Sequence, residues 1–107
     1  MTFSISSSAF GNGQPIPRRF TCEGENISPD LTWKEIPEGT LSLALIVEDP
    51  DAPLGIWIHW ILYNIPPSGT HLPENVPPQG IVTGIGTHGR NGFRKTGYGG
   101  PCPPPGK

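Results

Sequence analysis

Apolar residues gather in two runs near the middle of the chain, and both runs have the composition of buried β-strands. The stronger run covers 55–65 and is stopped by Pro66 and Pro67. The other run covers 40–48 and ends at Asp49. β-Branched and aromatic residues favour strands, and a strand that is apolar on both faces must be covered on both sides. The pattern therefore predicts two central strands that lie inside the protein.

The link between these two strands, residues 49–55, is short and rich in turn-forming residues. A parallel crossover needs about a dozen residues or more, so the two strands should be antiparallel neighbours. Regular alternation along the stronger strand would put Trp57 and His59 on one face and Trp60 on the other.

Weaker strand signals occur at 14–21, 31–34 and 81–83. From Gly84 onward the sequence predicts loop, because glycine and then proline dominate it. With 15 glycines and 15 prolines among 107 residues, no stretch has the composition of a helix. We therefore expect residues 1–107 to form a single all-β domain with antiparallel sheets.

Two strands that are apolar on both faces need two covering layers, and the predicted elements barely supply one. We therefore expect this chain to be part of a longer domain that is incomplete at its C-terminus. The C-terminal remainder would follow Lys107, either in a longer product or as a separate polypeptide after cleavage in this exposed loop. A separate hypothesis, about function, is a purely structural homodimer in which the aromatic strand packs against its symmetry mate.

The charge of the chain excludes several classes of partner. A net charge of −2 without a basic stripe predicts no binding to nucleic acid or to an acidic membrane surface. The N-terminus has no basic segment followed by an apolar one, so no secretory signal is visible. No apolar run approaches the ~18 residues that a spanning helix requires. We expect a soluble, cytoplasmic protein without a transmembrane segment.

Three polar residues stand close to the predicted hairpin. Asp49 and Asp51 follow one strand directly, and His59 lies within the other. If the hairpin brings them together, the carboxylates would favour the protonated form of His59. A polar spot inside an aromatic surround is the usual composition of a small-ligand site. The simpler interpretation is an Asp-Pro turn beside a histidine that finds partners within the core.

Motifs for catalysis are absent from the sequence. There is no Gly-x-Ser-x-Gly elbow, His-Glu-x-x-His helix or P-loop. A phosphoester hydrolase that uses Asp49, Asp51 and His59 is the alternative function, but nothing supplies a nucleophile or an oxyanion hole. His71 and His88 lie in predicted loops without a metal-ligand spacing. We expect neither an enzyme, nor a metal site, nor a cofactor.

The glycine-rich segment 96–101 permits a ligand to approach the backbone closely. Backbone N–H groups in such loops can form anion-binding nests. The alternative interpretation of this segment is a flexible connector, which would have the same composition.

Several motifs together resemble the phosphatidylethanolamine-binding protein family, whose members include Raf-kinase-inhibitor-like proteins. The form found here is similar to the bacterial and archaeal branch. The resemblance covers essentially the whole chain and implies an antiparallel, Greek-key β-sandwich-like fold. The motifs are Asp49-Pro50-Asp51-Ala52-Pro53, Trp57-Ile58-His59-Trp60, Gly97-Tyr98-Gly99-Gly100-Pro101-Cys102-Pro103-Pro104, Thr21-Cys22-Glu23-Gly24 and Asn26-Ile27-Ser28-Pro29.

The resemblance implies a function and a set of site residues. It implies non-catalytic binding of a small anion, such as phosphate or a phosphoethanolamine-like headgroup. It also implies a regulatory role through a protein partner, such as inhibition of a serine protease or a kinase. The expected pocket residues are Asp49, Asp51, Trp57 and His59, with Gly100 and Pro101 at the rim.

The chain departs from the family pattern in two ways. The family's second signature continues with His-Arg-Tyr, and this chain stops at Lys107, before that segment. A complete anion site is therefore not expected from this chain alone. In addition, Gly92 and Arg94 stand where the family pattern has Asp and Gly. Arg94 and Lys95 would add positive charge near the rim, or point into solvent.

Two cysteines, Cys22 and Cys102, lie in predicted loops, and neither belongs to a Cys-x-x-Cys pair. The expected cytoplasmic location favours two free thiols. Their position next to family signature segments favours a disulfide, which we adopt as the prediction.

Overall fold

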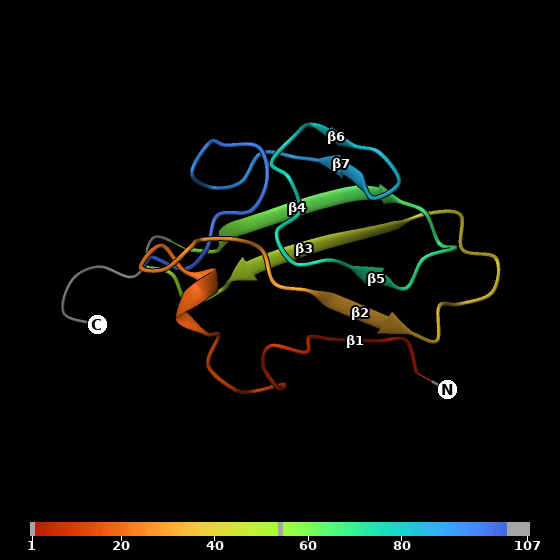
Figure 1. Cartoon of the computed structure of the whole chain (residues 1–107), viewed down its shortest axis with the longest axis horizontal. Helices are drawn as coiled ribbons and strands as arrows, with labels where there is room; N and C mark the ends of the chain where they lie inside the picture. Colours follow the sequence, from red (N-terminus) through yellow and green to blue (C-terminus); the bar gives the residue numbers. More distant parts are fainter. Residues whose placement is uncertain (1, 54, 103–107) are drawn as a thin grey trace.

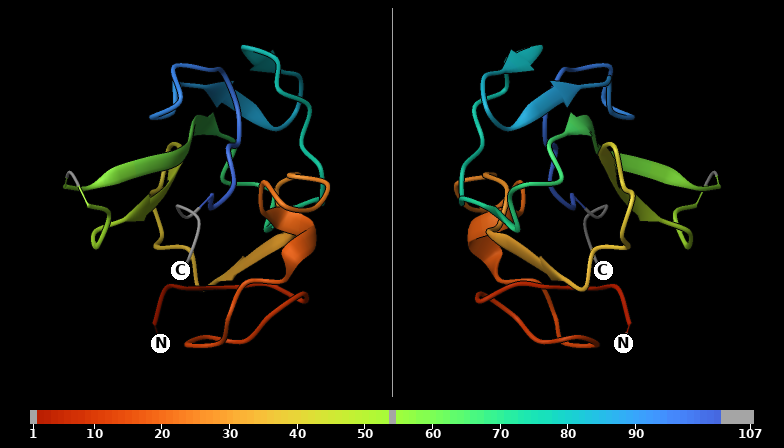
Figure 2. Two further views of the ribbon diagram at one scale, coloured as in Figure 1. Left: turned by 90° about the vertical axis from the view of Figure 1, so that its left-hand side faces the viewer. Right: turned by 90° about the vertical axis from the view of Figure 1, so that its right-hand side faces the viewer.

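The computed structural model describes residues 2–53 and 55–102, which fold into two antiparallel sheets and almost no helix. This confirms the all-β fold class. Figures 1 and 2 show the two sheets as separate layers. One sheet has the order β1-β2-β5 and the other β3-β4-β7-β6. The strands are β1 (Ser4–Ser6), β2 (Leu31–Lys34), β3 (Leu43–Asp49), β4 (Trp57–Ile65), β5 (His71–Leu72), β6 (Ile81–Val82) and β7 (Gly86–His88).

The central hairpin forms as predicted, because β3 and β4 pair antiparallel. Its register is irregular, however. Val47 lies opposite Trp60 and Glu48 lies opposite Ile58, so His59 is an extra residue in β4. Such a β-bulge interrupts the two-residue alternation of side chains.

The bulge corrects the predicted assignment of faces. Asp49 pairs with Trp57 and Val47 pairs with Trp60. Because Asp49 and Val47 are two residues apart in β3, both pairs lie on the same face of the sheet. Trp57 and Trp60 therefore share a face of the sheet. Regular alternation had predicted that they lie on opposite faces.

The weaker strand predictions had mixed outcomes. Residues 31–34 are β2, and Ile81–Val82 is β6. The prediction for 14–21 is wrong, because this segment is loop and a single 3₁₀ turn, Arg18–Phe20. Pro15 and Pro17 lack the N–H that a strand needs for pairing. The prediction that the chain is loop from Gly84 onward is also wrong in part, because this region contains β7.

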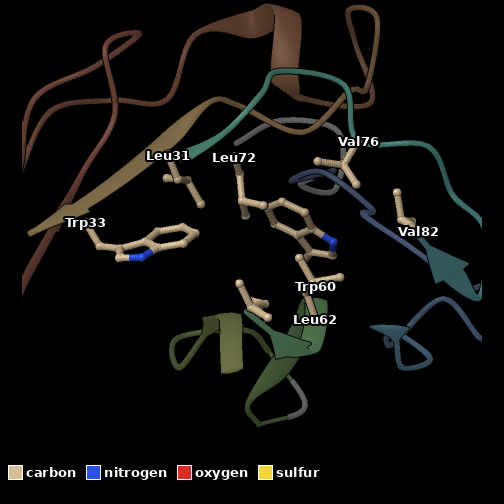
Figure 3. Close-up of a cluster of buried hydrophobic side chains, with 8 residues drawn as sticks. Leu31, Trp33, Trp60, Leu62, Leu72, Val76 and Val82 are labelled. Carbon is tan, nitrogen blue, oxygen red and sulfur yellow. The ribbon is translucent and has the colours of Figure 1, made fainter. Parts of the chain in front are cut away.

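The core lies between the two sheets (Figure 3). Trp60 and Leu62 of β4 are fully buried and point toward Leu31 and Trp33 of β2. Leu72, Val76 and Val82 extend the same cluster. Within the described ranges, no helix is long and apolar enough to cross a membrane.

Candidate functional site

The turn after β3 carries both predicted aspartates, and both are exposed. The Oδ1 atom of Asp49 accepts a hydrogen bond from the backbone N–H of Asp51 at 2.9 Å. This bond is the Asx-turn by which aspartate shapes a backbone turn. Strand pairing also sets Asp49 beside Trp57. The turn is therefore local structure that happens to present two carboxylates at the end of the hairpin.

The bulge residue His59 is buried, with 7% of its surface exposed. Two reciprocal bonds join it to Gly99. Its Nδ1 lies 2.7 Å from the Gly99 carbonyl oxygen, and its own carbonyl oxygen accepts from the Gly99 N–H at 2.8 Å. Because a carbonyl oxygen only accepts, the proton is on Nδ1. Within the described residues Nε2 forms no hydrogen bond, and neither aspartate bonds to the ring.

Phe93 packs against both this histidine and Trp57. The ring centroid of Phe93 is 5.2 Å from that of Trp57, edge to face, and 6.0 Å from that of His59. Gly92 makes this packing feasible, because a Cβ there would come within 2.6 Å of the Trp57 indole. The side chain that Asp would add at this position has no room without movement of Trp57.

Asn91, which sequence reasoning missed, organises the loop that carries Phe93. Its buried side-chain oxygen accepts from the N–H groups of Phe93 at 2.9 Å and Lys95 at 3.2 Å. Its side-chain amide donates to the Gly97 carbonyl at 2.9 Å. The loop is therefore held from inside by one amide group. An Asn next to Gly signals a turn, but nothing in the sequence indicates that this Asn is buried.

The predicted rim at Gly100 and Pro101 is bonded to a distant segment. The Gly100 N–H donates to the Asn26 side chain at 2.9 Å, and the Pro101 carbonyl accepts from the Cys22 N–H at 3.1 Å. A Cβ at Gly100 would overlap the Phe20 carbonyl oxygen. The N–H groups of Gly99 and Gly100 are thus both used inside the protein. They do not supply the anion-binding nest considered above.

The Cys22–Cys102 disulfide reinforces this junction, with 5.2 Å between the Cα atoms. Pro103 and Pro104 of the family motif, and the loop at Lys107 considered for cleavage, lie outside the described residues. The disulfide therefore joins the segment around Cys22 to the rim segment that carries Gly100 and Pro101.

Comparison with known proteins decides which family has this arrangement. The family model for phosphatidylethanolamine-binding protein matches residues 6–107. The chain belongs to this family. A UPF0098 protein of Aquifex aeolicus is 48% identical over 102 residues, which cover 95% of this chain and 59% of the relative. The chain thus spans less than two thirds of that relative's length.

Two solved structures of the family share the fold. One is YbcL of Escherichia coli, described as a new member of the mammalian family, with 40% identity and a TM-score of 0.85 over 98% of this chain. The other is a family homologue from Chlamydia trachomatis, with 40% identity and a TM-score of 0.84 over 96% of this chain. Membership supports a binding role and fits a protein that is not an enzyme.

This member of the phosphatidylethanolamine-binding protein family has a pocket of about 370 Å³. One of its lining residues is Gly99, which is hydrogen-bonded to His59. Of the predicted site residues, Gly100 lines the pocket, whereas His59 and Trp57 contact its lining residue Phe93. Among its described lining residues, Lys95 is the only cation. The lining consists of Cys22, Asn26, Asn91, Phe93, Lys95, Tyr98, Gly99, Gly100 and Cys102.

The remaining histidines differ from His59. Nε2 of buried His88 accepts from the Trp60 indole N–H at 2.9 Å, and its Nδ1 donates to the Gln79 carbonyl at 2.7 Å. Both ring nitrogens are therefore used by the fold. Exposed His71 contacts Thr32 at 3.2 Å. Within residues 2–53 and 55–102, no group of three His, Cys, Asp or Glu side chains could hold a metal ion.

Proposed function

We propose that this chain is the non-catalytic, anion-binding part of a phosphatidylethanolamine-binding family protein. It binds phosphate, or the phosphate of a small headgroup such as phosphoethanolamine, at Nε2 of His59. Asp49, Asp51 and Trp57 complete the wall on one side, and Gly100 and Pro101 form the rim on the other. The proposed partners of the longer protein are a serine protease or a kinase that it regulates, and its location is cytoplasmic.

The observation that carries this proposal is the asymmetric bonding of the His59 ring. The Gly99 carbonyl fixes the proton on Nδ1 and holds the ring in place. Nε2 is then the ring nitrogen without a hydrogen-bond partner among the described residues, and it is left to bond to a ligand. Burial of the ring beside Phe93 limits the access of water, which strengthens a hydrogen bond to a charged ligand. His88, with both nitrogens bonded inside the fold, cannot do this.

Titration calorimetry with inorganic phosphate and with phosphoethanolamine tests the proposal. Both ligands should bind. His59→Gln should remove most of the affinity. The control His71→Gln, at an exposed histidine, should leave binding unchanged. Equal loss in both variants, or unchanged affinity in His59→Gln, would contradict the assignment.

A further inference from the structure

The Cys22–Cys102 disulfide forms part of the wall of the pocket of about 370 Å³, because both cysteines line it. Both residues are also exposed. A pocket of this size admits a small molecule. A small thiol can therefore reach the two sulfur atoms. Exposed disulfides belong to the labile and regulatory class, in contrast to structural disulfides that resist reduction.

The segment 99–102 is fastened at both of its ends. At one end, Gly99 and His59 exchange two hydrogen bonds, of 2.7 and 2.8 Å. At the other end, the disulfide and the hydrogen bonds of Gly100 and Pro101 connect the segment to residues 22–26. These two parts of the chain lie side by side at the left of Figure 1. Among the described residues, the disulfide is the only covalent link across this junction.

Tyr98 marks the inner end of this segment. Its ring packs edge to face against the buried Trp60, with 5.6 Å between the ring centroids, and its hydroxyl donates to the Phe20 carbonyl at 2.7 Å. These contacts hold Tyr98 whether or not the disulfide is closed. Gly99 and Gly100, in contrast, have no side chain to pack. With the disulfide open, hydrogen bonds hold them, and the net contribution of each such bond is modest.

We propose that the Cys22–Cys102 disulfide is a redox-sensitive latch that keeps Gly99 bonded to His59. A small dithiol opens the latch by thiol–disulfide exchange. One thiolate of the dithiol attacks a protein sulfur and the bond between Cys22 and Cys102 breaks. The second thiol of the reagent then closes the reagent's own disulfide. The protein gains two electrons and two protons and is left with two thiols, and the dithiol is oxidised.

The latch would regulate anion binding, and in this respect the inference rests on the proposed function. The Gly99 carbonyl fixes the proton of His59 on Nδ1 and orients the ring. When the segment 99–102 is released, the ring loses this acceptor, and a smaller fraction of the molecules has Nε2 arranged for a ligand. The apparent affinity falls with the binding-competent fraction. The reduced protein should therefore bind phosphate more weakly.

Amide hydrogen exchange measured by NMR tests the latch without any ligand. Dithiothreitol should accelerate exchange at the N–H groups of Gly99 and Gly100 by roughly tenfold or more beyond the change at Trp33, because the segment then opens locally. The Trp33 N–H donates to the Thr70 carbonyl at 2.9 Å, next to the other sheet, and reports general loosening of the fold. Reoxidation should restore the slow exchange.

A matched variant separates the disulfide from its neighbouring hydrogen bonds. Asn26→Ala removes the acceptor of the Gly100 N–H and keeps the disulfide. The Gly99 N–H should stay protected in this variant while the disulfide is closed. On reduction, it should lose more protection than in the unsubstituted chain, because fewer bonds then hold the segment.

Several results would overturn the latch. Equal acceleration at Gly99 and Trp33, or unfolding of the reduced protein, would show that the disulfide only stabilises the fold as a whole. Unchanged exchange at Gly99 would show that hydrogen bonds alone hold the segment. Failure of dithiothreitol to expose two thiols to alkylation, followed by intact mass, would show that the disulfide is not accessible to reduction.

Titration calorimetry with inorganic phosphate in both redox states tests the regulation separately. The oxidised protein should bind more tightly than the reduced protein. Equal affinity in the two states would overturn the regulatory role. Absence of binding to the oxidised protein would contradict the anion site itself, and the exchange rates at Gly99 would still decide whether the latch exists.

Discussion

The indole N–H of Trp60 donates a hydrogen bond to Nε2 of His88 over 2.9 Å. Trp60 is fully buried, so its N–H has no alternative partner in water. The bond fixes His88 as the tautomer protonated at Nδ1, which in turn donates to Gln79. One pair of side chains thus connects the central strand β4 to β7 and to the segment before β6.

Replacing His88 by Leu should destabilise the protein by about 2–3 kcal/mol, because a buried N–H then lacks an acceptor. Urea unfolding followed by tryptophan fluorescence measures this loss. His71→Leu, at an exposed histidine, is the control and should change the free energy of unfolding by less than about 0.5 kcal/mol. Equal stability of the two variants would show that the Trp60 N–H finds another partner.

Arg94→Gly should stabilise the protein by about 1 kcal/mol. Arg94 has a φ of 63°, in the left-handed region where a side chain is strained and glycine is not. The family resemblance implies glycine at this position, and a φ of 63° suits glycine. Thermal unfolding should show a raised midpoint for this variant. Lys95→Gly, next to it at an ordinary φ, should instead lower the midpoint; a rise in both would point to lost charge repulsion.

Reduction of the Cys22–Cys102 disulfide should lower the stability considerably. The two cysteines are 80 residues apart in the sequence. The chain-entropy model gives about 4.5 kcal/mol for a loop of this length, as an upper value. Urea unfolding with and without a dithiol reductant measures the difference. The double variant Cys22→Ser, Cys102→Ser should be as unstable as the reduced protein and insensitive to the reductant.

The fold class and the central hairpin could be predicted from the sequence, because long apolar runs with turn residues between them have few other solutions. β1, β5 and β7 could not. Each has only two or three residues, too few for a periodic signal. Their pairing depends on partners that are distant in sequence.

The site was predicted less completely than the fold. The motif residues could be selected from the sequence. The bulge at His59 could not be predicted, because the strand was interpreted as a regular alternation of side chains. The roles of Asn26, which stands in a family motif, and of Asn91 were missed for a related reason. Each satisfies backbone groups that become its neighbours only after folding, such as the N–H of Gly100, 74 residues from Asn26. An asparagine in a loop carries no sign of this role.

Alkaline pH should destabilise the protein through Tyr98. Burial raises the pKa of Tyr98 from 10.0 to about 12, and its hydroxyl donates to the Phe20 carbonyl at 2.7 Å. Because the folded state holds this proton more tightly than the unfolded state, the contribution is fully present below pH 10 and is lost as the pH rises toward about 12. Urea midpoints measured from pH 8 to 12 should fall in this window. In Tyr98→Phe this part of the decline should disappear, whereas Tyr63→Phe, at an exposed tyrosine, should retain it. An identical decline in Tyr98→Phe would assign the effect to other groups.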